Sequence, residues 1–174
     1  TRIHSRPATE VALLIGAHKA NIPDPCLMYH RIQEIPFSSN RKRMEVKCHP
    51  VGGAHTCKAF TLSARRHKPN STDLISPDGS LYFVKGMPKA ILGECKTHTA
   101  ANGSAVALTK VGKKRALSQS HRTAVCGLRV LAIAYGLSLD DLTFAGIVGL
   151  EDPPREGVPQ SVANLEKSGV KTIM

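Results

Sequence analysis

The chain has 174 residues, enough for one domain of ordinary size and a little more, and its 41% hydrophobic content excludes a chain that is disordered throughout. Lys and Arg outnumber Asp and Glu by 24 to 13, a formal net charge of +11, so we expect an anionic partner such as a nucleotide, a nucleic acid or an acidic membrane surface. The longest uncharged apolar stretch, residues 142–150, is far shorter than the ~18 residues of a membrane-spanning helix, and residues 1–6 lack the apolar run of a signal peptide.

The N-terminal half predicts one helix followed by antiparallel strands. A helix is expected over residues 8–20, with Glu10 in its first turn, where a carboxylate suits the helix dipole. A helical turn is expected at 26–30, and strands at 31–36, 43–48 and 57–63, the last two joined as a hairpin by a Gly-containing loop. Residues 65–80 read as a polar loop that ends in a turn signal.

The C-terminal half predicts two further helices and three strands before the composition changes. Strands are expected at 81–85, 128–135 and 142–150, helices at 88–95 and 109–126, and irregular structure at 96–108. Pro88 suits a first helical turn, and Gly127 is the expected end of the second helix. The apolar strand at 142–150 is expected to be central in its sheet.

Two prolines after residue 150 predict a domain boundary. The run Asp152-Pro153-Pro154-Arg155 cannot continue a central strand. A helix at 156–168, ended by Gly169, and a strand at 170–174 then read as the start of a βαβ unit. The sequence therefore predicts an α+β domain over 1–150, a mostly antiparallel twisted sheet flanked by helices, and the beginning of a parallel-sheet domain over 151–174. We expect the chain to be a piece of a longer protein.

Five widely spaced cysteines without a C-x-x-C pair indicate reduced thiols in a cytosolic setting. Cys48, His49, His55 and Cys57 flank a loop with two glycines. These two thiols and two imidazoles could hold zinc tetrahedrally if the loop closed correctly. The alternative is a hairpin whose strand ends happen to carry these residues, and the spacing favours it because it matches none of the usual structural zinc patterns.

Residues 35–46 place an aromatic ring beside two serines and the basic triplet Arg41-Lys42-Arg43, before an alternating strand. Phe37 could offer a flat face to a nucleotide base, while the triplet biases the surroundings toward anions. The same ring could instead be an apolar plug at a strand end. The stretch alone leaves both interpretations open.

Several motifs occur in an order and spacing that resemble the cytoplasmic nucleotide-binding domain of P-type cation ATPases. The resemblance covers nearly the whole chain and is closest to the secretory-pathway (Golgi) calcium/manganese ATPases, with the endoplasmic-reticulum calcium pumps second. The motifs are Ala8-Thr9-Glu10-x-Ala12-Leu13, Pro36-Phe37-Ser38-Ser39-x-Arg41-Lys42-x-Met44, Val84-Lys85-Gly86-x-Pro88, Gly127-Leu128-Arg129-Val130-Leu131-Ala132, Leu142-Thr143-Phe144-x-Gly146-x-Val148-Gly149 and Asp152-Pro153-Pro154-Arg155.

The resemblance implies roles for individual residues. Phe37 matches the aromatic that stacks on adenine, and Glu10 matches the acid near the adenine amino group. Lys85 matches the lysine of the nucleotide pocket, with Gly86 beside it to let the backbone approach closely. Arg129 matches the arginine that reaches toward the phosphates. Two further sets follow from the same motifs: Ser38 is grouped with the nucleotide-binding residues, and Asp152, Pro153, Pro154 and Arg155 form the hinge into a Rossmann-like phosphorylation domain.

The resemblance also implies what the parent protein does. It would be an ATP-driven calcium transporter, located in a secretory-pathway membrane and using Mg²⁺ with the nucleotide. This cytosolic piece would bind ATP or ADP but not hydrolyse ATP, because the phosphorylated Asp of the motif Asp-Lys-Thr-Gly-Thr is not in the sequence. Its partners would be the phosphorylation, actuator and transmembrane domains, with the piece itself monomeric and no nucleic acid bound.

Two observations stand against a simple transfer of these roles. Met87 and Lys89 occupy positions where the family commonly has Ala and Glu, and the larger Met beside the Lys-Gly turn could reshape the pocket wall. A different class of function, a non-enzymatic basic module for nucleic acid or acidic lipid, would use Arg41-Lys42-Arg43 and Lys113-Lys114-Arg115. It predicts steeply salt-dependent binding.

Overall fold

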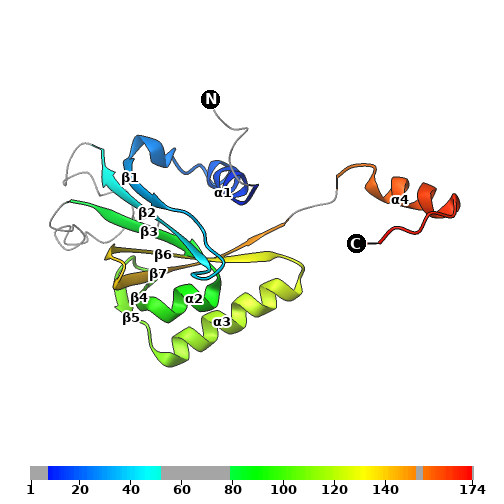
Figure 1. Ribbon diagram of the computed structural model, residues 1–174. Coiled ribbons are helices and arrows are strands. Elements are labelled where there is room, and N and C mark those ends of the chain that lie inside the picture. Colours follow the sequence, from blue (N-terminus) through cyan, green and yellow to red (C-terminus); the bar gives the residue numbers. More distant parts are fainter. Residues whose placement is uncertain (1–7, 52–78, 152–154, 174) are drawn as a thin grey trace.

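The computed structural model describes residues 8–51, 79–151 and 155–173 (Figure 1). Within them, seven strands form one sheet in the order β1-β2-β3-β6-β7-β4-β5. Every neighbouring pair is antiparallel except β4 and β7, so the predicted α+β class and mostly antiparallel sheet are confirmed. The strands are β1 Tyr29–Ile35, β2 Arg43–Pro50, β3 Leu81–Gly86, β4 Cys95–Thr99, β5 Ala105–Ala107, β6 Arg129–Ser138 and β7 Asp141–Leu150; the helices are α1 Ala8–Lys19, α2 Pro88–Glu94, α3 Lys110–Val125 and α4 Val158–Lys167, with a 3₁₀ turn at Pro25–Leu27.

The hydrophobic core lies on one face of the sheet, beneath α2 and α3 (Figure 1). Val84 of β3 and the two alanines Ala132 and Ala134 of β6 share this face because side chains alternate along a strand. Ile91 of α2 and Leu142 of β7 pack against them, and both are fully buried. Because the alanine side chains are small, α2 packs close to the sheet. This packing fixes the position at which β3 ends and α2 begins.

The opposite face carries a looser layer, with α1 lying over it. Tyr29 and Phe83 meet there edge to face, with ring centroids 5.2 Å apart. The helix buries none of its residues, and Leu14 and Ile15 of its predicted apolar stripe are 38% and 50% exposed. This face of the sheet is therefore only partly covered.

The ends of the helices follow the sequence signals. Thr109 caps α3, its hydroxyl accepting a hydrogen bond from the backbone N–H of Gly112 at 3.1 Å. Gly127 follows α3 with φ 82°, and Gly169 follows α4 with φ 78°, as the left-handed position after a helix requires. The N–H groups of Gly169 and Val170 bond back to the carbonyls of Glu166 and Leu165, both at 2.9 Å. The predicted glycine stops are thus confirmed.

Two predicted elements are wrong. Residues 96–108, expected to be irregular, contain most of β4 and all of β5, because β4 finds a distant parallel partner in β7. Residues 170–173, expected to begin a strand, form none, since no described segment lies beside them to share a ladder. The expected strand at 57–63 and most of the loop at 65–80 lie outside the described residues, and the boundary at residue 150 stays a prediction.

Gly86, at the end of β3, lies close to the backbone of Lys42 and Arg43 at the start of β2. A Cβ at this position would lie 2.5 Å from the carbonyl oxygen of Lys42 and 2.8 Å from the Cα of Arg43. The same Lys42 carbonyl accepts a hydrogen bond from the N–H of Met87 at 2.9 Å. Backbone atoms fix the crowding, so no side-chain movement can relieve it.

We predict that Gly86→Ala lowers the free energy of unfolding by about 1–3 kcal/mol, the usual cost of overpacking. Gly93→Ala is the matched control, because a Cβ on this glycine of α2 would meet nothing within 4 Å. It should leave stability unchanged or raise it by about 0.5–1 kcal/mol, since alanine favours a helix. Urea unfolding of both variants tests this, and equal stability of the two would contradict the close approach.

A second prediction concerns pH. Burial raises the pKa of the Cys95 thiol from 9.0 to about 11, and Cys95 is only 1% exposed. The folded protein therefore keeps a proton that the unfolded chain releases, so this contribution is complete below pH 9 and is lost as the pH rises toward 11. Between pH 8 and 10 the wild type should lose up to about 1–2 kcal/mol more stability than Cys95→Ala. Urea unfolding of both proteins at pH 8 and pH 10 tests this, and an equal loss of unfolding free energy in wild type and Cys95→Ala would refute it.

Candidate functional site

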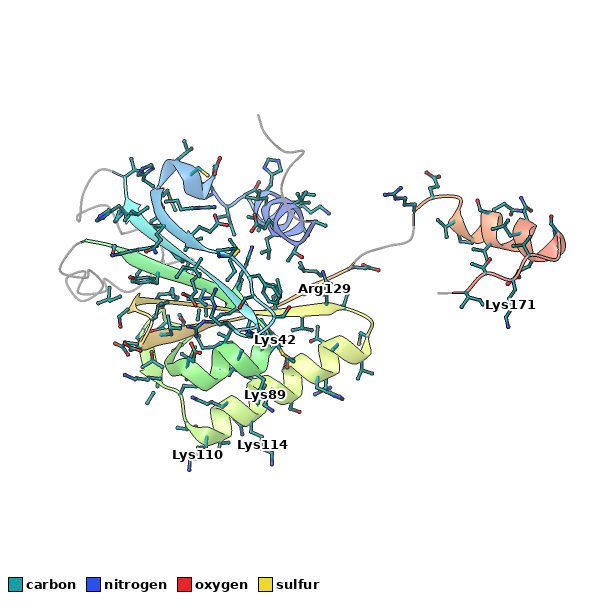
Figure 2. The ribbon with its side chains drawn as sticks, viewed as in Figure 1. Lys42, Lys89, Lys110, Lys114, Arg129 and Lys171 are labelled. Carbon is teal, nitrogen blue, oxygen red and sulfur yellow. The ribbon has the colours of Figure 1, made fainter. Side chains whose placement is uncertain are left out.

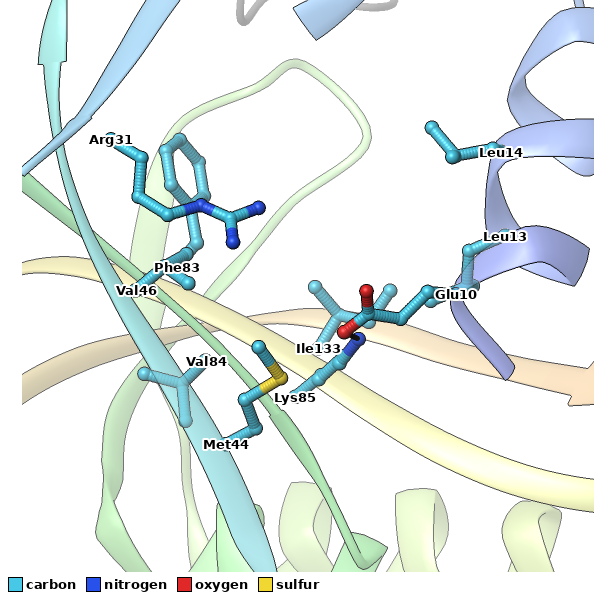
Figure 3. Close-up of a pocket in the computed structure, with 10 residues that line it drawn as sticks. All are labelled: Glu10, Leu13, Leu14, Arg31, Met44, Val46, Phe83, Val84, Lys85 and Ile133. Atoms are coloured by element: carbon cyan, nitrogen blue, oxygen red, sulfur yellow. Dashed lines mark hydrogen bonds and ion pairs between the residues drawn. The ribbon is translucent and has the colours of Figure 1, made fainter. Parts of the chain in front are cut away.

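A pocket of about 240 Å³ lies between α1 and the less covered face of the sheet (Figure 3). Its floor is apolar, and its polar groups come from three separate elements. Concave apolar surfaces with a few converging polar groups are typical of small-molecule sites. The lining residues are Glu10, Leu13 and Leu14 of α1, Arg31 of β1, Met44 and Val46 of β2, Phe83, Val84 and Lys85 of β3, and Ile133 of β6.

An ion pair between Glu10 and Lys85 closes one side of this pocket. The Lys85 ammonium donates to Glu10 Oε1 at 2.9 Å, across 75 residues of sequence (Figure 3). Lys85 stands opposite Met44 on one neighbouring strand and Ile133 on the other, so all three share the pocket face. The side chains of Lys85 and Glu10 are 25% and 22% exposed, which leaves both within reach of a ligand.

Arg31 brings a second cation to the pocket, and the sequence did not single it out. It pairs across the sheet with Cys48, and its guanidinium points toward the pocket in Figure 3 while also contacting the Glu34 carboxylate. Burial raises the pKa of the Cys48 thiol, and the positive charge of Arg31 partly opposes that rise. The only hint in the sequence was that Tyr29 and Arg31, two residues apart, share one face of the strand. The register shift between Arg31 and Gln33 interrupts this alternation, so the pattern does not extend along the strand.

Phe37 projects from the loop between β1 and β2 and does not plug a strand end, because it is 59% exposed. It is not among the residues that line the pocket. Ser38, beside it, is occupied by the turn: its hydroxyl accepts from the N–H of Arg41 at 3.2 Å, and its carbonyl accepts from the N–H of Lys42 at 2.8 Å. Ser38 thus shapes the loop that presents Phe37.

The basic triplet is largely neutralised within the domain. Arg41 contacts Glu45 at 3.0 Å and donates to the carbonyl of Pro36, also at 3.0 Å. Arg43 pairs with Glu45, which is 2% exposed, and with Glu94 at the end of α2. Lys42 differs from both: it is exposed, it has φ 56°, and its ammonium has no partner in the described part of the chain.

The register of the sheet places most of the candidate residues at one end. Gly86 pairs with Arg43 on β2 and with Ala132 on β6, so the loop after β1, the end of β3 and the start of β6 lie at the same edge. Arg129 begins β6 and shares the face of Ile133 by alternation. Its side chain is exposed, and no ion pair within residues 8–51, 79–151 and 155–173 engages it (Figure 2). Phe37, Lys42, Lys85, Gly86 and Arg129 therefore gather around one sheet edge.

Comparison with known proteins identifies the family. The model of the "P-type ATPase, cytoplasmic domain N" matches residues 3–157. The chain belongs to this P-type ATPase family. Calcium-transporting ATPase type 2C member 2 is 35% identical in both Mus musculus and Homo sapiens, and type 2C member 1 of Mus musculus is 34% identical. Each alignment covers 95% of this chain, which spans about 15% of the length of these relatives.

These findings confirm the family, and the type 2C relatives confirm the resemblance to secretory-pathway calcium pumps. The family model extends over the pocket and all the strands of the sheet. No helix in the described part of this N domain is long and apolar enough to cross a membrane.

The remaining predicted residues of the N domain are only partly described. Cys48 is buried in β2, and His49 Nδ1 donates to the carbonyl of Gly79 at 3.1 Å. His55 and Cys57 lie outside the described residues, and the described ones contain no group of three potential metal ligands. Of the hinge residues, Asp152, Pro153 and Pro154 also lie outside. Arg155 is exposed, and its carbonyl accepts from Val158 at 3.2 Å.

Helix α1 buries no residue, so few apolar contacts hold it against the sheet. The Glu10–Lys85 ion pair is therefore an important link between α1 and the sheet. We predict that Lys85→Met lowers global stability by less than about 1 kcal/mol, the usual value for a partly exposed pair. It should nevertheless speed amide hydrogen exchange throughout α1, since local opening needs few broken contacts. Lys113→Met is the control, as Lys113 donates to the Gly93 carbonyl on the opposite face of the sheet. Unchanged exchange in α1 would show that the leucines alone hold the helix.

Proposed function

We propose that this N domain binds ATP in the pocket beneath α1 and presents the γ-phosphate to an aspartate elsewhere in the parent chain. The observation that carries the proposal is the ion pair of Glu10 and Lys85 at an apolar pocket, on the end of the sheet where the β1–β2 loop presents the exposed ring of Phe37. A base needs an apolar slot with a polar end, and a triphosphate needs unpaired cations nearby. The same sheet edge supplies all of these.

The apolar floor of the pocket suits the adenine base. Met44, Val46 and Ile133 provide a surface without competing polar atoms, and the Glu10 carboxylate accepts hydrogen bonds, as the adenine amino group requires. Phe37 then has a flat face to offer, and base stacking on an aromatic side chain is worth ~1–3 kcal/mol. Because Phe37 is already exposed, it loses little packing when it turns onto a base.

In this proposal the cations at the sheet edge bind the phosphates. Arg129 presents a planar fork that matches phosphate geometry, and the exposed Lys42 adds a point charge. Lys85 uses one of its three N–H groups on Glu10, so two remain for the nucleotide. Arg41 and Arg43 contribute less, because carboxylates already neutralise them.

The pocket does not fit a divalent metal of its own. Glu10 is the one carboxylate among the residues that line it, and Lys85 already occupies that group. Hard cations such as Mg²⁺ prefer several oxygen ligands. In this proposal Mg²⁺ accompanies the nucleotide and is held by the phosphorylation domain.

The domain contributes positioning rather than covalent chemistry. Phosphoryl transfer depends mainly on geometry and electrostatic stabilisation, and holding the γ-phosphate in line with its acceptor supplies much of both. The parent protein in this proposal is a calcium-transporting ATPase of a secretory-pathway membrane, with manganese as a second ion. Its phosphorylation, actuator and transmembrane domains complete the cycle, and the stretch 152–155 is the hinge that swings this domain toward the aspartate.

We predict that Phe37→Ala and Lys85→Ala each weaken ATP binding at least fivefold, which is about 1 kcal/mol, the lower range of one lost stacking or charge contact. Phe37→Tyr keeps the ring and should bind within twofold of wild type. Lys89→Ala removes an exposed cation of α2, which packs on the opposite face, and should also bind as wild type does. Isothermal titration measures all four, and wild-type affinity in both alanine variants would exclude this pocket.

A further inference from the structure

Helix α3 is strongly basic and carries no acidic residue. Its 16 residues, KVGKKRALSQSHRTAV, include Lys110, Lys113, Lys114, Arg115 and Arg122. Exposed helices usually mix charges of both signs, because pairs of opposite charge three or four residues apart stabilise the helix. In α3 every such pair of charged residues is repulsive. The helix thus holds a concentration of positive charge that its own sequence does not offset.

The position of these charges makes the arrangement unfavourable for the isolated helix. Lys110, Lys113 and Lys114 occupy the first turn and its border, where the helix dipole favours anions, and no acidic residue lies in that turn. Lys110 and Lys114 are also neighbours at the i,i+4 spacing. Lys113 donates a hydrogen bond to the Gly93 carbonyl, but at Lys110 and Lys114 a neutral or acidic residue would stabilise the helix better. Folding therefore does not explain the lysines at these two positions.

Four of the five cations, Lys110, Lys114, Arg115 and Arg122, are exposed, and two exposed valines lie on the same helix. Lys110, Lys114 and Arg122 follow the solvent-facing stripe of α3, and Figure 2 shows Lys110 and Lys114 directed away from the sheet. Val111 and Val125, 63% and 74% exposed, stand near the two ends of this stripe. A helix of this length is about 24 Å long. The basic face therefore combines cations with apolar anchors over the span of a short helical segment.

We propose that the basic face of α3 is a docking surface for an acidic segment of a partner protein, whose carboxylates meet Lys110, Lys114 and Arg115 and whose aliphatic side chains cover the valines. Complementary charge steers such a segment and fixes its register. A single-stranded nucleic acid would need aromatic rings among the cations, and α3 has none. An acidic membrane would favour a helix with a free apolar side, but the side of α3 that faces inward packs against β6, β7 and α2.

This surface lies on the opposite face of the sheet from the nucleotide pocket. Helices α2 and α3 cover the core face, whereas the pocket lies beneath α1 (Figure 1). The two sites share no lining residue. The inference therefore does not rest on nucleotide binding, and both ligands can be bound at once.

The test uses charge reversal with a matched control. The variant Lys110→Glu/Lys114→Glu/Arg115→Glu changes the net charge as much as the control Lys19→Glu/Lys167→Glu/Lys171→Glu, whose three sites are exposed elsewhere. The probes are a 20-residue helical peptide built from Glu, Ala and Leu, vesicles of phosphatidylcholine with phosphatidylserine, and duplex DNA, each at 50 mM and 150 mM NaCl.

The peptide should bind wild type and the control with similar affinity and lose at least tenfold in affinity for the α3 variant. The variant should also melt at an equal or higher temperature, because glutamates suit the first turn of a helix, so lost binding cannot be ascribed to unfolding. Equal loss in the control, or tighter wild-type binding to vesicles or DNA than to the peptide, would overturn the proposal. So would a peptide that binds the α3 variant as well as wild type.

Discussion

The alternation of side chains along β3 and β6 is the constraint on which the rest of this domain depends. Val84 points into the core beneath α2, so its neighbour Lys85 must point to the other face. A shift of one residue in β3 would bury the lysine and expose the valine. The core therefore fixes the position of the pocket lysine more firmly than any contact that the lysine makes itself.

Glycine 86 extends the same constraint to the loops. Because β2 and β3 nearly touch there, the chain before β2 is held against the end of β3 through the Lys42 carbonyl. Phe37 and Arg41 belong to that same loop, and Arg43 is the first residue of β2 after it. The sequence suggested Gly86 only as a site where a ligand approaches the backbone. The structure shows that packing of β2 against β3 also requires a glycine there. Binding and stability at this residue cannot be varied separately.

Much of the fold could be predicted from the sequence because its signals are local. The caps at Gly127 and Gly169, the proline that begins α2 and the apolar run of β7 depend on neighbours in the chain. Strand β4 could not be predicted, since its polar sequence becomes a strand only beside β7, which lies more than 40 residues later. The ion pair of Glu10 and Lys85 spans a still longer gap, 75 residues. The motifs indicated both residues as ligands of a nucleotide, but periodicity alone could not place them in contact.

The distribution of acidic residues explains how a chain with a net charge of +11 keeps a few cations available. Glu45 and Glu94 are committed to the arginines beside the β1–β2 loop, and Glu10 is committed to Lys85. Arg129 and Lys42 at the sheet edge receive no such partner among the described residues, and neither do the exposed cations of α3. Pairing every cation would have stabilised the domain in isolation. Under the two proposals, one of the unpaired groups meets a polyphosphate and the other, on the opposite face, meets an acidic protein. Salt should then weaken each interaction independently of the other.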